Sequence, residues 1–262
     1  MALNFQYKKK LYLLDQDGTL YKGDRLFPGT SAFLKRIKES GARYLFITNN
    51  SSKTNAEYVT KLQKFNIAAT LNDFYTSSDA TIDYLKVHHP NAYVYLVATK
   101  AVTKHFIDAG IKLSADPLLV SVAVLTYDTE LDYAKLITMT TLLRNEKVTY
   151  LATNPDLVCP TEDGYLPDCG SFAIMLENAT GRTPLYLGKP RALFVETILA
   201  RFNYQKTDVV IIGDRLYTDI ALGHNAGVDT VLVLSGEATQ ADIEKHEITP
   251  TYIAESINDI VP

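Results

Sequence analysis

The sequence contains few cysteines and has no excess of positive charge. Cys159 and Cys169 are the only two cysteines among 262 residues, and their spacing is not that of a metal-binding pair. Two cysteines could close one disulfide, but we expect two reduced thiols, as in cytosolic proteins. Twenty-six Lys and Arg residues against 30 Asp and Glu residues give a formal net charge of -4, with a pI of about 5.7. Without a basic excess, we expect no binding to nucleic acid polymers.

Long apolar runs are also missing. The most apolar stretch, PLLVSVAVLTY, is far shorter than the ~20 residues of a membrane-spanning helix. The lysines of MALNFQYKKK are not followed by an apolar core of signal-peptide length. No GxGxxG motif follows the first apolar run, which argues against a nicotinamide dehydrogenase. We therefore expect a soluble, cytoplasmic protein that does not bind membranes. The sequence leaves a homo-oligomer open.

Short apolar runs alternate with amphipathic segments of helical length. The runs are continuous, as expected for strands that are covered on both faces. They lie at residues 10–15, 43–49, 184–188, 208–214 and 229–235. Helices are predicted at residues 31–41 and 55–66. Such alternation predicts an α/β fold with a doubly wound, parallel, Rossmann-like sheet, whose ligands bind at the carboxyl ends of the strands.

The middle of the chain repeats this pattern separately. Strands are predicted at 92–99, 120–128 and 149–154, and helices at 101–110, 130–145 and 169–181. We predict a core domain formed by residues 1–78 and 182–262, with residues 79–181 inserted as a second α/β domain. The two segments in which the chain passes between the core domain and the inserted domain would form a hinge.

Two carboxylates follow the first predicted strand, in LYLLDQDGTLY. Asp15 and Asp17 would point to the same side if the strand continued, and their repulsion would raise the pKa of one of them. A turn would explain Asp17-Gly18, but not a second Asp at the end of a buried run. One carboxylate could attack phosphorus while the other protonates the leaving oxygen.

Two more carboxylates follow a late strand, in IIGDRLYTD. Asp214 ends the apolar run as Asp15 does, whereas Asp219 alone would be an ordinary carboxylate at a helix start. With carboxylate oxygens as ligands, the expected ion is Mg²⁺. We therefore predict that the paired acids form half of a metal-dependent phosphoryl-transfer site.

Polar residues end two further apolar runs. Thr48 and Asn49 fit a helix cap and a phosphate ligand equally well. Lys189, after residues 184–188, is either an ordinary surface lysine or a cation that neutralises phosphate and the acids. If the four runs belong to one sheet, their polar ends converge on one crevice.

The motifs DQDGT, ITNN, GKP and GDRLYTD, in this order and at these separations, resemble the haloacid dehalogenase superfamily of phosphatases. The large insertion between ITNN and GKP, together with ATNPD at residues 152–156, resembles the NagD-like branch, which includes p-nitrophenylphosphatases. One departure is Gln16, where relatives usually carry an apolar residue; we expect altered packing there and no loss of catalysis.

The resemblance implies a role for each matching residue. Asp15 would be the nucleophile and Asp17 the general acid and base. Thr48 and Lys189, assisted by Asn49, would bind the phosphoryl group. Mg²⁺ would be held by the residues Asp15, Asp17 (through its main-chain carbonyl), Asp214 and Asp219. The insertion would be a cap domain.

The implied function is Mg²⁺-dependent hydrolysis of small phosphomonoesters through an aspartyl-phosphate intermediate. Nucleoside monophosphates and sugar phosphates both remain open as substrates, with p-nitrophenyl phosphate as an artificial one. Two alternatives stay open. One is a phosphotransferase or mutase with the same site, and the other is a non-catalytic signalling module that carries an aspartyl phosphate.

Overall fold

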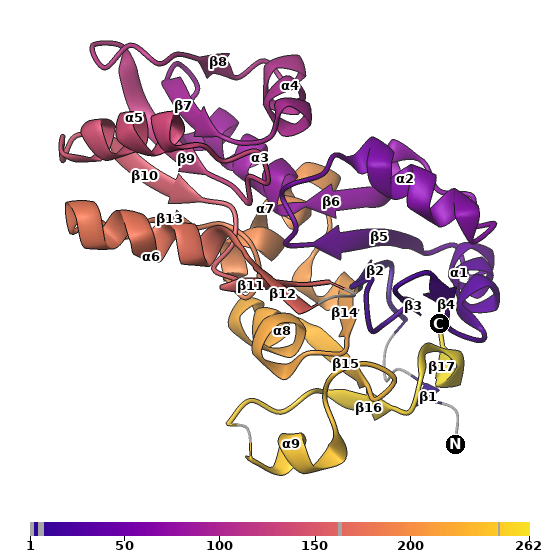
Figure 1. The fold of residues 1–262 in the computed structure, drawn as a ribbon. Helices are drawn as coiled ribbons and strands as arrows, with labels where there is room; N and C mark the ends of the chain where they lie inside the picture. The colour runs from indigo at the N-terminus through magenta and orange to yellow at the C-terminus, as the bar shows by residue number, and fades with distance from the viewer. Residues whose placement is uncertain (1–2, 5–7, 162–163, 246) are drawn as a thin grey trace. The chain divides into compact units, whose positions relative to one another are not determined.

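The computed structural model describes residues 3–4, 8–161, 164–245 and 247–262, which form two compact units (Figure 1). Unit 1 comprises Met1–Thr48, Tyr58–Tyr75 and Lys189–Pro262, and unit 2 comprises Asn49–Glu57 and Thr76–Gly188. The domain boundaries and the cap role that were predicted for residues 79–181 stay predictions.

Unit 1 is built on a six-stranded sheet with the order β16-β15-β14-β2-β5-β6. Its strands are β2 (Leu11–Leu14), β5 (Arg43–Thr48), β6 (Phe74–Thr76), β14 (Val209–Gly213), β15 (Asp229–Val233) and β16 (Tyr252–Ala254). The pairs β14–β15, β14–β2, β15–β16 and β2–β5 are parallel. Every residue of β2 and β14 is buried, because both faces of the sheet are covered. The predicted α/β fold with a doubly wound parallel sheet is confirmed.

Helices connect the strands of unit 1, and those predicted at residues 31–41 and 55–66 are present. They are α1 (Thr30–Glu39), α2 (Asn55–Lys64), α7 (Ala192–Phe202), α8 (Ala221–Ala226) and α9 (Gln240–Lys245). From β2 the chain proceeds through α1 to β5, and from β14 it proceeds through α8 to β15 on the other side. Because such crossovers are right-handed, the two connections lie on opposite faces, and the direction of winding reverses between β2 and β14.

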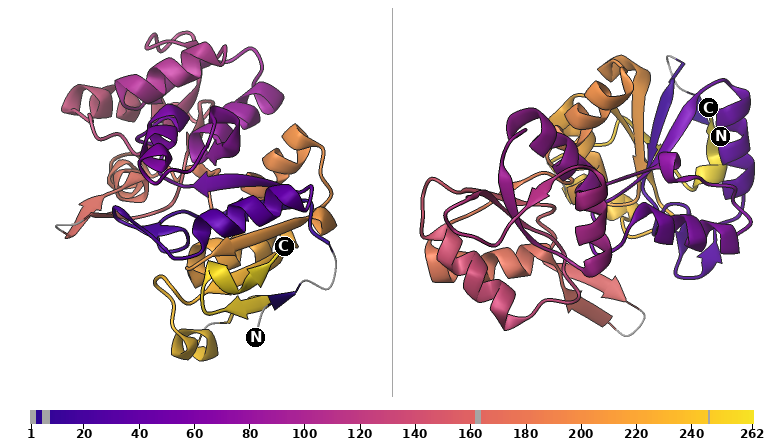
Figure 2. Two further views of the ribbon diagram at one scale, coloured as in Figure 1. Left: turned by 90° about the vertical axis from the view of Figure 1, so that its right-hand side faces the viewer. Right: turned by 90° about the horizontal axis from the view of Figure 1, so that it is seen from above.

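Short elements complete unit 1. They are β1 (Leu3–Asn4) paired with β17 (Ile260–Val261), β3 (Tyr21–Lys22) paired with β4 (Arg25–Leu26), three 3₁₀ turns (Leu71–Asp73, Lys206–Asp208 and Ile257–Asp259), and a π-helical turn (Leu216–Ile220). Strands β1 and β17 bring the two ends of the chain together, as both views in Figure 2 show. No helix in the described part of the chain is long and apolar enough to cross a membrane.

Unit 2 has its own five-stranded sheet with the order β13-β10-β9-β7-β8. Its elements are β7 (Tyr93–Val97), β8 (Lys112–Leu113), β9 (Val120–Leu125), β10 (Thr149–Ala152), β13 (Leu185–Tyr186), the hairpin β11 (Val158–Thr161) and β12 (Gly164–Pro167), and helices α3 (Ser77–His88), α4 (Lys100–Asp108), α5 (Tyr133–Leu143) and α6 (Cys169–Thr180). The main sheet is parallel throughout. Its central strands pack against α5 and α6 through apolar side chains such as Leu125, Met139 and Ala173.

One strand assignment was wrong. The run at residues 184–188 was expected to join the same sheet as β2, β5 and β14, but its strand β13 pairs with β10 in unit 2. The periodicity of a short apolar run identifies a strand, but it does not tell which sheet the strand joins. Lys189 directly follows this run and belongs to unit 1.

Candidate active site

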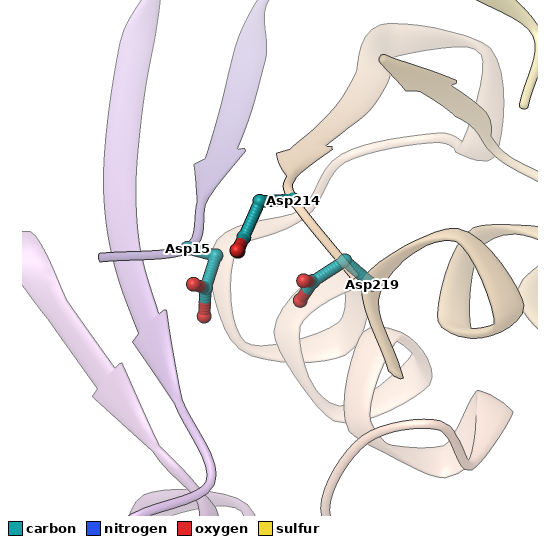
Figure 3. A group of neighbouring side chains, drawn as sticks. All are labelled: Asp15, Asp214 and Asp219. Atoms are coloured by element: carbon teal, nitrogen blue, oxygen red, sulfur yellow. The ribbon is translucent and has the colours of Figure 1, made fainter. Parts of the chain in front are cut away.

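Three carboxylates meet at the point where the winding of the unit 1 sheet reverses. Leu14 pairs with Ile212, so that Asp15 and Asp214 directly follow the neighbouring strands β2 and β14. Asp219 comes from the π-helical turn beyond β14. One carboxylate oxygen of each residue lies within 4.8 Å of those of the other two, and Figure 3 shows the three side chains pointing toward one another. This is the position in the sheet at which doubly wound folds bind ligands.

Lys189 joins this cluster. Its Nζ lies 2.6 Å from Asp15 Oδ1 and 2.7 Å from Asp219 Oδ1, and the residue is only 4% exposed. A lysine this deeply buried needs charged partners. Lys189 is therefore not an ordinary surface lysine, which was one of the two alternatives that the sequence left open. It joins the cluster even though the strand that precedes it, β13, belongs to the sheet of unit 2.

The cluster has more negative than positive charge. Burial raises the pKa of Asp15 to about 8, with Asp219 and Asp214 adding to the effect and Lys189 opposing it. Burial and then the charge of Asp219 raise the pKa of Asp214 to about 6. Burial would lower the pKa of Lys189, but the carboxylates of Asp15 and Asp219 hold it above its usual value. One ammonium group does not balance three carboxylates, so the donor set suits an additional cation.

Asp214 and Asp219 are held firmly by their surroundings. The backbone N–H of Glu237 donates to Asp214 Oδ2 at 2.8 Å, and the Thr19 hydroxyl donates to Asp214 Oδ1 at 3.4 Å. The backbone N–H of Arg215 donates to Asp219 Oδ2 at 3.3 Å. Asp219 thus acts as the helix-start carboxylate that the sequence suggested, and its other oxygen contacts Lys189.

Glycines make room for these side chains. A Cβ atom at Gly18 would lie 2.1 Å from Asp214 Oδ2, and φ at Gly18 is +87°. A Cβ atom at Gly213 would lie 2.3 Å from the Cβ of Asp219. Any larger residue would displace a carboxylate from the cluster.

Asp17 lies outside this group of three carboxylates. Its side chain is exposed, and the chain turns directly after it at Gly18. The Gln16 carbonyl closes this turn by accepting from the backbone N–H of Leu20 at 2.8 Å, while the Gly18 N–H donates to the Tyr21 carbonyl at 2.8 Å. The roles predicted for Asp17, as acid and base and as a main-chain metal ligand, stay predictions.

The boundary between the two units falls between Thr48 and Asn49. Thr48 is half-buried at the end of β5 in unit 1, two positions beyond Phe46, which pairs with Leu14. Asn49 belongs to unit 2, where its Nδ2 donates to Asp156 Oδ2 at 2.9 Å and its carbonyl accepts from the Ser77 hydroxyl at 2.6 Å. Their predicted part in phosphate binding stays a prediction.

Sequence reasoning missed two groups that hold Asp214. The Thr19 hydroxyl belongs to the DQDGT motif, so the motif offered a signal. The N–H of Glu237 offered none, because a backbone donor is independent of the side chain that it carries.

Comparisons with known proteins identify the family. Residues 12–112 match the family described as haloacid dehalogenase-like hydrolase, and residues 186–260 match a second, HAD-hydrolase-like family. The acid sugar phosphatase of Staphylococcus epidermidis is 35% identical over 247 residues, which cover 94% of this chain and 95% of that protein. This chain belongs to the haloacid dehalogenase-like hydrolases.

Solved structures place it among the NagD-like phosphatases of this family. The 4-nitrophenylphosphatase of Thermotoga maritima superposes with a TM-score of 0.90 at 36% identity, covering 96% of this chain and 95% of that chain. A putative NagD protein superposes with a TM-score of 0.88 at 35% identity, covering 97% of both chains. The resemblance that was inferred from DQDGT, ITNN, GKP and GDRLYTD is confirmed, and the chain is a phosphatase.

Phosphatases of the haloacid dehalogenase family generally use a divalent metal ion. The cluster of Asp15, Asp214 and Asp219 offers three carboxylate oxygens that lie within 4.8 Å of one another, close enough to share one ion. The excess of negative charge in the cluster also favours the binding of a cation. The site thus suits a divalent cation that prefers oxygen ligands.

Proposed function

We propose that this phosphatase is a Mg²⁺-dependent phosphomonoester hydrolase that acts through a phosphorylated Asp15. The observation that carries the proposal is the cluster of three carboxylates and one buried ammonium group at the reversal point of the sheet. Asp15, Asp214 and Asp219 would hold the ion together with the Asp17 carbonyl. When bound, Mg²⁺ would neutralise charge on the transferring phosphoryl group.

The reaction would proceed in two steps. A carboxylate oxygen of Asp15 attacks phosphorus, the bond from phosphorus to the ester oxygen breaks, and the carboxylic acid of Asp17 gives its proton to that oxygen. A water molecule then attacks the phosphoryl group on Asp15 and gives a proton to the Asp17 carboxylate, which releases inorganic phosphate and restores Asp15. Lys189 and Thr48, with Asn49 assisting, would bind phosphoryl oxygens.

Phosphorylated sugars are the substrate class that we propose to test first, because a 35% identical relative is an acid sugar phosphatase. Nucleoside monophosphates are the second class. A phosphate-release screen over both classes, with p-nitrophenyl phosphate as reference and with and without Mg²⁺, tests the proposal. We expect Mg²⁺-dependent release from at least one sugar phosphate.

Two results of the screen would contradict the proposal. One is a folded protein that releases no phosphate from any ester but carries a stable phosphoryl group on Asp15, as a signalling module would. The other is transfer of the phosphoryl group to an added alcohol in preference to water, which would indicate a phosphotransferase.

Asp17→Asn should affect esters according to their leaving groups. We expect kcat for an alkyl phosphate to fall by roughly 10²- to 10⁴-fold, the usual contribution of general acid–base catalysis. The loss should be much smaller for p-nitrophenyl phosphate in single-turnover assays of Asp15 phosphorylation, because nitrophenolate leaves without a proton. Asp242→Asn, at an exposed carboxylate of α9, is the matched control and should leave both rates unchanged. Equal losses for the two esters would exclude the acid role.

A further inference from the structure

A buried side-chain hydrogen bond closes the turn that carries Asp17. Gln16 stands between the two acids of the DQDGT motif, and Tyr21 begins β3. The Tyr21 hydroxyl donates to Gln16 Oε1 at 3.1 Å, and the two residues are only 2% and 3% exposed. The turn between them also contains the backbone hydrogen bonds from Leu20 to Gln16 and from Gly18 to Tyr21. Side chains and backbone therefore hold the same six residues together.

The aromatic ring of Tyr21 also has contacts that hold it in place. Its ring lies 5.4 Å from the ring of Phe65, and the Lys61 ammonium lies 4.1 Å from the centroid of its ring. Burial raises the pKa of the Tyr21 hydroxyl, which therefore stays protonated and remains a hydrogen-bond donor. Through Tyr21, the hydrogen bond to Gln16 thus links the turn to helix α2 and the residue that follows it.

Gln16 lowers the stability of the fold at this position if its only role is to fill space. In the described part of the chain, its Nε2 is buried without a hydrogen-bond partner. A buried amide that lacks one of its partners destabilises a fold, whereas a pair of apolar side chains at positions 16 and 21, such as Met and Phe, would leave no buried polar group unpaired. A role in folding stability alone would therefore favour such an apolar pair, and the presence of Gln and Tyr favours a role in activity.

The exposure of Asp17 indicates which group needs this support. Asp214 and Asp219 are buried and are oriented by hydrogen-bond donors, as described above. The side chain of Asp17 is exposed, so its direction depends on the backbone that carries it. That backbone is the segment between Gln16 and Tyr21, and an isolated bridge pairs Asp17 with Tyr21.

We propose that Gln16 and Tyr21 are positioning residues that hold the Asp17 carboxyl group in the direction required for proton transfer to the leaving group. The proposal rests on the proposed function of Asp17. Loss of the hydrogen bond leaves the side chains of Asp15, Lys189, Asp214 and Asp219 in place but lets the turn move. The proton then reaches the leaving oxygen less often.

The test is a double-mutant cycle with Gln16→Met, Tyr21→Phe and the double variant. Each single substitution removes the same hydrogen bond and keeps the size of the side chain. We expect kcat for an alkyl phosphate to fall about five-fold in each, the factor that corresponds to one neutral hydrogen bond. Because the two residues act through one bond, the double variant should match the single variants. KM and the single-turnover rate of phosphoryl transfer from p-nitrophenyl phosphate should change by less than about two-fold.

Three further measurements separate positioning from packing. The double variant should unfold at the same temperature as the wild type or at a higher one, because it removes the unpartnered amide together with both partners of the hydrogen bond and leaves no buried polar group unpaired. Tyr44→Phe, which removes the hydroxyl of another buried tyrosine of the same core, should leave kcat unchanged. In an Asp17→Asn background, Gln16→Met should cause no further loss.

The outcomes are distinguishable. Losses that multiply in the double variant, equal losses for both esters, or unchanged kcat in both single variants would overturn the positioning role. A wild-type protein that hydrolyses no phosphomonoester would instead overturn the proposed function, because these comparisons presuppose an active enzyme.

Discussion

Asp15→Asn should lower phosphate release from every substrate, including p-nitrophenyl phosphate, by on the order of 10⁶-fold, as expected when a covalent nucleophile is removed. An amide oxygen is a much poorer nucleophile than a carboxylate, and the variant also loses one of the three carboxyl groups in the cluster. The nitrophenolate leaving group cannot compensate, because the missing step is the attack on phosphorus. This behaviour differs from that of Asp17→Asn, whose loss depends on the leaving group.

The variant should remain folded. Asn has the size of Asp, and Lys189 keeps its contact with Asp219 at 2.7 Å. Circular dichroism and thermal unfolding check the fold, and Asp242→Asn serves again as the control substitution. Acid-quenched wild-type protein should carry phosphate on the peptide that contains Asp15, and the variant should not. Near-full hydrolysis of p-nitrophenyl phosphate by a folded variant would exclude Asp15 as the nucleophile.

Removal of divalent cations should also abolish turnover, and added Mg²⁺ should restore it. Without the ion, one ammonium group faces three carboxylates and an incoming phosphate dianion. Repulsion between these groups opposes both binding and attack. Turnover of all esters should therefore fall to background on dialysis against a chelator. Undiminished turnover of metal-depleted protein, with depletion verified by elemental analysis, would contradict a metal requirement.

Thermal unfolding detects the binding of the same ion independently of catalytic activity. A ligand that binds only the folded state at 100 times its Kd stabilises it by about 2.7 kcal/mol. Saturating Mg²⁺ should thus raise the Tm of the wild type, and Asp214→Asn should eliminate this rise. In metal-free protein, Asp214→Asn should melt at or above the wild-type temperature, because a buried charge with a raised pKa is removed. An unchanged Mg²⁺ response in Asp214→Asn would place the ion elsewhere.

The sequence by itself determined the main strands of both sheets and the meeting of Asp15 with Asp214. β2, β5, β14 and β15 lie within the predicted runs. Continuous apolar runs are local patterns, so they identify buried strands without knowledge of their partners. In a parallel sheet, the residue after each strand lies at the same edge, which is why Asp15 and Asp214 could be placed together.

Only the tertiary structure decided which strands pair and which groups hold the acids. It placed β13 in the sheet of unit 2, while Lys189 contacts Asp15 and Asp219 in unit 1. β6 and β16 were not predicted, because three-residue strands carry too little periodicity. The N–H of Glu237 and the hydrogen bond between Gln16 and Tyr21 became visible only in the folded chain. These contacts depend on register, burial and backbone direction, which arise when distant segments pack, and no short stretch of sequence encodes them.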